Sequence, residues 1–245
     1  MARILKATIG IRFSERMFRL STHAGALIDN LLALRGKPLD SGDFETIGRD
    51  AHDMNIKVYS ETAGKYLHID LENVTYTVDL YDKGENFSFD TFLDNFSAIW
   101  NVINETLHCR EIRRVGLVTE RRFLKGNEPN RFLLDHLTTF KFDGFPAKFN
   151  LSFEVRKNTG PGGLPDPTKD DFINYLYFFY DSILDIEHSE PGAININLDV
   201  QRYFSPSLRD GPIAALRKLK AEYDKADQDL LARIKPFGLA DGKPA

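Results

Sequence analysis

Residues 194–200 read Ile-Asn-Ile-Asn-Leu-Asp-Val, and an amphipathic stretch at 212–235 follows them. Side chains along a strand point alternately to its two faces, so the first stretch predicts a strand with one apolar face. The second stretch has apolar residues at helical spacing and predicts a long helix. These residues are Leu216, Leu219, Tyr223, Ala226, Leu230 and Ile234. A strand followed by such a helix is the unit expected where helices cover one face of a sheet.

The same pattern of a one-faced strand, a turn and an amphipathic helix occurs at 3–35 and 74–107. The residue identities do not repeat, so the sequence itself shows no repeat. We predict an α+β fold in which about three main helices cover a largely antiparallel sheet. Residues 1–245 are expected to form one domain, with a possible subdivision at the Gly/Pro-rich loop 158–168 and a flexible tail at 236–245.

Shorter patterns predict further elements between these units. A hairpin is expected at 56–61 and 66–71, a short helix at 130–137, and strands at 44–50, 111–123 and 145–157. Residues 172–180 are almost wholly apolar and aromatic, which predicts a strand buried on both faces. We expect Ser21 or Thr22 to cap the first helix, Asp90 to cap the second, and Pro206 to interrupt the chain after residue 200.

Composition and charge exclude several classes of protein. The formal net charge is -4 and the isoelectric point is about 5.9, whereas dedicated nucleic-acid binders usually carry a basic domain. The single cysteine, Cys109, cannot form an internal disulfide, which fits a reducing compartment. No stretch is apolar for the eighteen or so residues that a membrane helix needs. We therefore predict a cytoplasmic protein that does not insert into a membrane.

The sequence carries no recognisable catalytic, metal or cofactor motif. It has no Cys-x-x-Cys, no pair of histidines four residues apart, and no Gly-Lys-Ser/Thr in its Gly-rich loop. Cys109 has Arg110 and Arg113 nearby, which favours a reactive thiolate, but an inert buried cysteine is the commoner case. We predict no catalytic residue, no bound metal and no cofactor.

Cations crowd the predicted strand at 110–125. Its candidate ligand-binding residues are Arg113, Arg114, Arg121 and Arg122. Period-two geometry places alternate members on opposite faces, where a pair of cations could bind phosphate. This predicts a nucleic-acid or nucleotide binder as one alternative. Solvated ion pairs with neighbouring acids are the favoured interpretation, because such pairs are common on protein surfaces.

Two other features suggest functions. Acids at 181–190 surround His188, which gives a metal-dependent hydrolase as a second alternative, although acids in turns are the simpler interpretation. The apolar side of the last helix is either buried in the domain or free for a partner helix or a second copy of the chain. For the latter case the candidate partner-binding residues are Leu216, Leu219, Tyr223 and Leu230.

The run Arg114-Val115-Gly116-Leu117 and the strand ending Ile11-Arg12-Phe13 resemble a sporadically distributed, uncharacterised bacterial family. Its marker is Arg-x-Gly-Leu-Arg-Tyr-x-Asn, and its members also end in a strand and a long helix. The second half of the marker is replaced here by residues 118–121. The resemblance implies no reaction or cofactor, but a role in accessory or antiviral-defence cassettes. We therefore expect a non-enzymatic binding, sensing or regulatory protein that acts with a protein partner.

Overall fold

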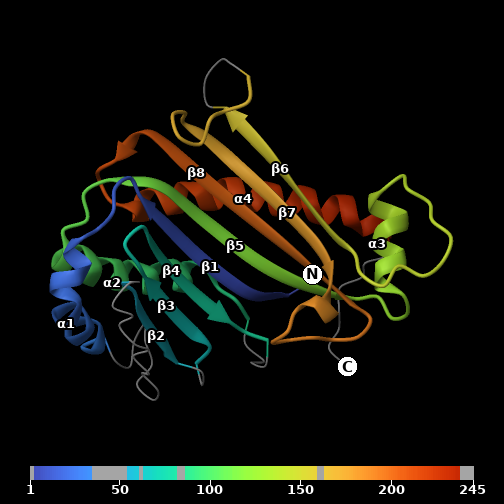
Figure 1. The fold of residues 1–245 in the computed structure, drawn as a ribbon, viewed down its shortest axis with the longest axis horizontal. Helices are drawn as coiled ribbons and strands as arrows, with labels where there is room; N and C mark the ends of the chain where they lie inside the picture. The colour runs from blue at the N-terminus through green and yellow to red at the C-terminus, as the bar shows by residue number, and fades with distance from the viewer. Residues whose placement is uncertain (1–2, 35–53, 61–62, 82–85, 159–162, 238–245) are drawn as a thin grey trace.

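A computed structural model describes residues 3–34, 54–60, 63–81, 86–158 and 163–237 (Figure 1). Its strands form one antiparallel sheet in the order β2-β3-β4-β1-β5-β8-β7-β6. They are β1 (Ile4–Phe13), β2 (Ile56–Ser60), β3 (Lys65–Ile69), β4 (Asn73–Asp79), β5 (Ile112–Leu124), β6 (Asn150–Asn158), β7 (Phe172–Asp181) and β8 (Ala193–Leu208). The helices are α1 (Arg19–Leu32), α2 (Phe89–Leu107), α3 (Pro129–Leu137) and α4 (Pro212–Ile234), with short 3-10 turns η1 (Ser182–Leu184) and η2 (Lys235–Phe237). This confirms the predicted α+β fold.

The order of elements divides the chain into two similar halves. The first half runs β1-α1-β2-β3-β4-α2 and the second runs β5-α3-β6-β7-β8-α4. In each half the first strand lies at the centre of the sheet and the second at its outer edge, and β1 pairs with β5 antiparallel. An approximate two-fold axis between β1 and β5 therefore relates the halves, with α1 and α3 at opposite ends of the sheet (Figure 1).

The two faces of the sheet differ in what covers them. The inner face carries apolar side chains such as Ile9, Leu117 and Val200, each at most 1% exposed, and α2 and α4 lie against it (Figure 1). The other face, here called the open face, carries Gly10, Gly116 and polar side chains. Burial of the inner apolar face against two amphipathic helices supplies the main driving force for folding.

Helix starts depend on local caps that the periodic pattern does not locate. α1 begins at Arg19 and Phe18 gives it no side-chain cap, so the prediction that Ser21 or Thr22 caps it is wrong. α2 is capped by Ser88, whose hydroxyl accepts a hydrogen bond from the Thr91 amide at 3.4 Å, and Asp90 lies in its first turn instead.

Strand boundaries in the second half differ from the expectation. β6 begins only at Asn150, which leaves Phe145 in the loop before it. β8 continues through Pro206 to Leu208, so Pro206 does not end the strand. β7 is not buried on both faces, because it lies next to the edge strand and Tyr177 remains half-buried.

Two expectations concern residues outside those the structure describes. The predicted strand at 44–50 lies wholly outside them, as do residues 238–245 of the predicted tail. The Gly/Pro-rich loop lies between β6 and β7, which pair with each other as neighbours in the one sheet.

Candidate functional site

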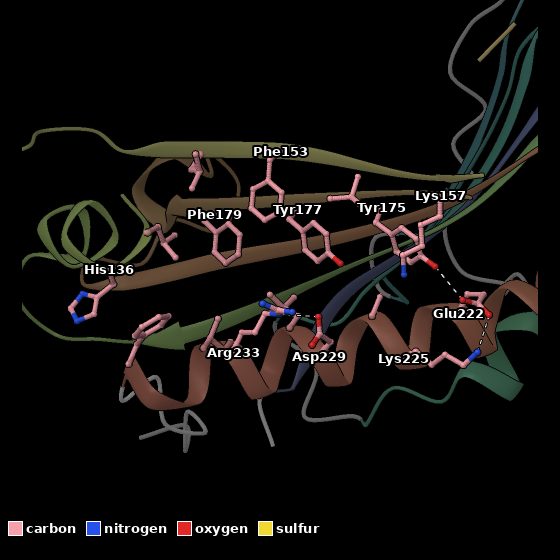
Figure 2. A pocket seen from close by; sticks show the side chains of 17 residues that line it. His136, Phe153, Lys157, Tyr175, Tyr177, Phe179, Glu222, Lys225, Asp229 and Arg233 are labelled. Atoms are coloured by element: carbon pink, nitrogen blue, oxygen red, sulfur yellow. Dashed lines mark hydrogen bonds and ion pairs between the residues drawn. The ribbon is translucent and has the colours of Figure 1, made fainter. Parts of the chain in front are cut away.

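A groove lies between α4 and the inner faces of β6 and β7 (Figure 2). Its volume is about 740 Å³. The sheet side is lined by Leu151, Phe153, Val155, Lys157, Tyr175, Tyr177 and Phe179. The helix side is lined by Glu222, Lys225, Ala226, Asp229, Leu230, Arg233 and Ile234, and His136, Leu137 and Phe237 close one end.

Aromatic rings form the sheet side of the groove. The ring of Phe153 stacks on Tyr177 with centroids 4.9 Å apart, and it lies 6.1 Å from the ring of Phe179. Phe153 is 46% exposed and Val155 is 42% exposed, although both point to the inner face of the sheet. A contiguous patch of exposed apolar surface in a concave groove is typical of binding sites.

Charged side chains from α4 form the rim of the groove. Glu222 accepts a hydrogen bond from the Tyr175 hydroxyl at 3.1 Å and pairs with Lys225 at 2.9 Å (Figure 2). The bond from Lys225 holds the pKa of Glu222 below its ordinary value. Burial raises the pKa of both Tyr175 and Tyr177, so their hydroxyls stay protonated and can donate hydrogen bonds.

Further apolar side chains are exposed in the loop that continues from α3 to β6. Phe140, Phe142 and Phe145 are 65%, 63% and 82% exposed, and the first two rings stack with centroids 6.1 Å apart. Leu137, just before this loop, lines the end of the groove. The exposed aromatics at 140–145 and the groove are therefore neighbours along the chain.

The apolar stripe of α4 lies in the chain's own core. The four candidate partner-binding residues, Leu216, Leu219, Tyr223 and Leu230, are at most 5% exposed. The Tyr223 hydroxyl hydrogen-bonds to Thr119 of β5 at 2.5 Å. Leu216, Leu219 and Tyr223 are therefore covered by the chain's own core, whereas Leu230 also lines the groove described above.

Two of the four candidate arginines are held at the strand ends by the chain itself. Arg113 donates to the backbone carbonyls of Phe204 and Pro167, the latter at 2.6 Å. Arg114 lies on the open face, where it donates to the Tyr203 hydroxyl at 3.2 Å. Both guanidinium groups therefore make hydrogen bonds within the chain.

The other two arginines are buried ion pairs on opposite faces of β5. Arg121 points to α4 and binds Asp227 through both Nε and Nη2, at 3.1 and 2.7 Å. Arg122 points to the open face and pairs with Asp185 and Glu190. Both arginines therefore form ion pairs, but with acids of distant segments instead of the neighbouring acids expected, and each arginine side chain is less than 10% exposed instead of solvated.

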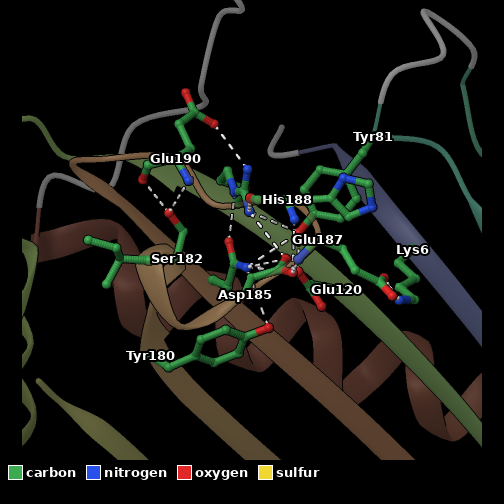
Figure 3. Close-up of polar contacts among 12 residues, drawn as sticks. Lys6, Tyr81, Glu120, Tyr180, Ser182, Asp185, Glu187, His188 and Glu190 are labelled. Carbon is green, nitrogen blue, oxygen red and sulfur yellow. Dashed lines mark hydrogen bonds and ion pairs between the residues drawn. The ribbon is translucent and has the colours of Figure 1, made fainter.

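Arg122 binds several groups of the loop at 182–192. Figure 3 shows Asp185, His188 and Glu190 of this loop in the polar cluster. Arg122 Nε donates to Asn195 at 2.8 Å, its Nη1 to Glu190 at 3.2 Å, and its Nη2 to the backbone carbonyl of His188. These bonds tie the loop after β7 to the open face of β5 and β8. Removal of one partner of such a buried pair would leave the other charge uncompensated, which is strongly destabilising.

Tyr81 and His188 complete the cluster from the β4 side. Their rings stack with centroids 4.1 Å apart, and the Tyr81 hydroxyl donates to Glu120. Burial, with the nearby Glu120 carboxylate, raises the pKa of Tyr81, so the hydroxyl stays protonated. His188 Nε2 lies 2.9 Å from a carboxylate oxygen of Asp79, which fixes the loop to β4.

Among the described residues, one group has the donor types that hold a metal ion. It consists of Asp79, Glu187 and His188, whose ligand atoms lie within 4.8 Å of one another. Asp79 and His188 already bind each other, and Glu187 is mostly exposed and lies 3.8 Å from the amine of Lys6. In this group the side chains of Asp79 and His188 are mostly buried and bound to each other, and Glu187 faces the solvent.

A patch of the open face holds polar atoms without partners. The Oδ1 atoms of Asn174, Asn197 and Asp199 are buried and have no hydrogen-bond partner among the described residues. Burial raises the pKa of Asp199 to about 6, although Gln201 donates to its other oxygen at 2.6 Å. Gly116 borders this patch, because an added Cβ would lie 3.7 Å from Asp199 Oδ1.

Cys109 follows α2 and is partly buried, with its sulfur 3.3 Å from that of Met17. Burial raises the pKa of the thiol to about 12, so the nucleophilic thiolate is scarce at neutral pH. The inert interpretation of this residue fits that environment better than a reactive one.

Comparison with known proteins adds no family. The chain matches no model of a protein family, and no curated protein is detectably similar to it in sequence. In the part of the chain that the structure describes, no helix has the length and apolar character needed to cross a membrane. The resemblance carried by Arg114 to Leu117 stays a prediction, and those residues lie within β5.

The sequence contained part of the signal for the groove. Phe153 and Val155 alternate with Ser152 and Glu154, which marks an apolar face on β6. The pattern does not tell whether a helix covers that face, because coverage depends on where the helix of another segment lies. The missing information was the edge position of β6, which only the strand order supplies.

Proposed function

We propose that this chain is a non-enzymatic binding component that recognises a protein partner through the groove between α4 and β6–β7. The exposure of Phe153 and Val155 carries the proposal, because large apolar side chains on the inner face of a sheet are normally buried. Protein interfaces are enriched in aromatic residues at their centre and have a polar rim, and the groove has both features.

The polar parts of the molecule support a binding role over an enzymatic one. Arg121 and Arg122 are committed to buried carboxylates, and the thiol of Cys109 is kept protonated. A cytoplasmic location and a place in a bacterial accessory or defence cassette belong to the same proposal, and they rest on the sequence pattern and the family resemblance.

The test compares two substitutions that add the same charge to an exposed aliphatic side chain. Val155→Asp places a carboxylate in the groove, and Ile186→Asp places one in the loop at 182–192, where Ile186 is 96% exposed. Tagged wild type and both variants are used to capture partners from extracts of the host cell, with quantitative mass spectrometry of the bound proteins.

We expect a stoichiometric partner that binds wild type and Ile186→Asp and is lost with Val155→Asp. Retention of the partner by Val155→Asp would place recognition elsewhere and overturn the proposed surface. Recovery of the wild-type chain alone, also after chemical cross-linking in the cell, would overturn the proposed function.

A further inference from the structure

The two outer edges of the sheet occupy the same place in the two halves but differ in burial. On β2 the inward-pointing Ile56 and Val58 are 3% and 4% exposed. On β6 the inward-pointing Phe153 and Val155 are 46% and 42% exposed. Within the described residues, the approximate two-fold axis therefore relates an edge with buried inner side chains to an edge whose inner side chains are nearly half exposed.

The helix after the first strand also differs between the halves in length and in packing. α1 has 14 residues, packs beside α2, and buries Leu27 and Leu31 completely in the core that also contains Ile56 and Val58. Its counterpart α3 has only 9 residues and packs mainly against β7. Within the described residues α3 reaches the groove only with His136 and Leu137 at one end.

From this broken symmetry we infer that the groove is completed by an amphipathic α-helix of the partner protein, lying along α4 as α1 lies along α2. The inference rests on the proposed function and names the kind of partner for the same site. A helix of 14 residues is about 21 Å long, which is roughly the length of a strand of six or seven residues. It would therefore cover most of the inner face of β6.

The chemistry of the groove specifies the partner helix. Its apolar side chains must recur at every third or fourth residue to face Phe153, Val155 and Tyr177 together. The rim has three cations and two acids among Lys157, Lys225, Arg233, Glu222 and Asp229. Charge is thus nearly balanced, and apolar contact must supply most of the affinity.

A second copy of the chain fits the groove less well than a partner. The long helices of the described part, α1, α2 and α4, each bury their apolar residues in the chain's own core. None of them has a free apolar side to place in the groove of another copy. An isolated helix segment of a different protein does not have this constraint.

An extended strand is the other common occupant of a sheet edge. A strand that pairs with β6 would lie beside it in the sheet and satisfy its free backbone groups. Such a strand would not lie over the inner face, so Phe153 and Val155 would stay exposed. A helix over that face removes this exposed surface and is the occupant that the burial pattern favours.

Selection from two peptide libraries tests the inference with the full-length protein. One library presents a randomised helix face on a small helical scaffold, and the other presents unconstrained peptides of ten residues. Binders to wild type are then measured against Val155→Asp and Ile186→Asp. We expect helix-library binders with apolar residues at positions i, i+3 or i+4, and i+7, weakened at least tenfold by Val155→Asp and unaffected by Ile186→Asp.

The other outcomes separate the inference from the proposed function. Binders with alternating apolar residues, drawn from the unconstrained library and sensitive to Val155→Asp, would overturn the helix and leave protein recognition in place. The absence of binders in both libraries, together with a rise in the melting temperature of wild type but not Val155→Asp on adding decanoate, would assign the groove to a small apolar molecule and overturn both. Binders insensitive to Val155→Asp would also overturn both.

Discussion

The edge strands β2 and β6 show how one arrangement of strands can serve two purposes. Both lie at the outside of the sheet, and both turn aliphatic or aromatic side chains toward the helices. On β2 those side chains are at most 4% exposed, whereas on β6 Phe153 and Val155 are 46% and 42% exposed. The difference teaches that the same strand order can occur in two halves whose edge strands are buried to different extents, which leaves apolar surface exposed at one edge.

The largest expected effect is a loss of folding free energy, and it is tested by making the same Val→Asp substitution on each edge strand. Val58→Asp places a carboxylate where the wild-type side chain is 4% exposed, and it should cost about 4 kcal/mol or more of folding free energy because the charge has no partner. Val155→Asp, at a position that is 42% exposed, should cost less than about 1 kcal/mol. Urea unfolding of both variants measures the difference. Equal costs would mean that the edge at β6 is closed in solution.

The second prediction concerns the buried ion pair between Arg121 of β5 and Asp227 of α4. Asp227→Ala leaves the guanidinium of Arg121 buried without its carboxylate, which should cost about 3–5 kcal/mol. Asp224→Ala on the same helix removes a partly exposed pair with Lys220 and should cost less than about 1 kcal/mol. Denaturant unfolding gives both values. Similar costs for the two variants would show that the buried pair does not fix α4.

The open faces of the two halves also differ in charge, and this difference should make the stability of the protein depend on pH. β1 and β4 present the neutral pair Thr8 and Thr77, hydrogen-bonded at 2.8 Å, whereas β8 presents Asp199 with a pKa of about 6, raised from 3.8 by burial. The folded state binds this proton more tightly than the unfolded state. Stability contributed by the protonated acid is therefore lost as pH rises from about 4 through 6.

Replacing the acid by its neutral analogue should remove this dependence. Asp199→Asn is expected to raise the free energy of unfolding at pH 8 by about 1–3 kcal/mol, with little change at pH 4. Melting temperatures of the two proteins between pH 4 and 8 should diverge as pH rises. Parallel curves over this range would contradict the burial of a charged carboxylate at this position.

Sequence periodicity was sufficient to predict individual helices and strands, but it did not predict which strands pair with each other. Alternation on β1 and β4 and the helical spacing on α2 and α4 predicted these elements to within a few residues, since burial of one face imposes the period. The strand predicted at 194–200 continues as β8 to Leu208. The pairing of β1 with β5, which relates the halves, joins residues about a hundred positions apart. Nothing in a local pattern encodes that contact.

The candidate site was less predictable for the same reason. The pattern identified Leu216 and Tyr223 as a buried stripe or a partner surface but could not choose, because both uses require the same apolar spacing. It identified the arginines of β5, but their partners Asp227 and Asp185 come from distant segments. Burial and pairing are properties of the assembled fold, and they decide which residues remain available for binding.

The smallest expected effect tests how far the docking surface extends beyond the groove. Phe142 is 63% exposed and touches mainly Phe140, so Phe142→Ser should change the free energy of unfolding by less than about 0.5 kcal/mol. Residues around the centre of an interface usually contribute under about 1 kcal/mol, so binding of a groove ligand should weaken less than about fivefold. Calorimetric titration of the groove ligand into Phe142→Ser and into Val155→Asp compares the loss of affinity at the two positions. A larger loss from Phe142→Ser than from Val155→Asp would move the centre of recognition from the uncovered edge of the sheet to the loop at 138–149.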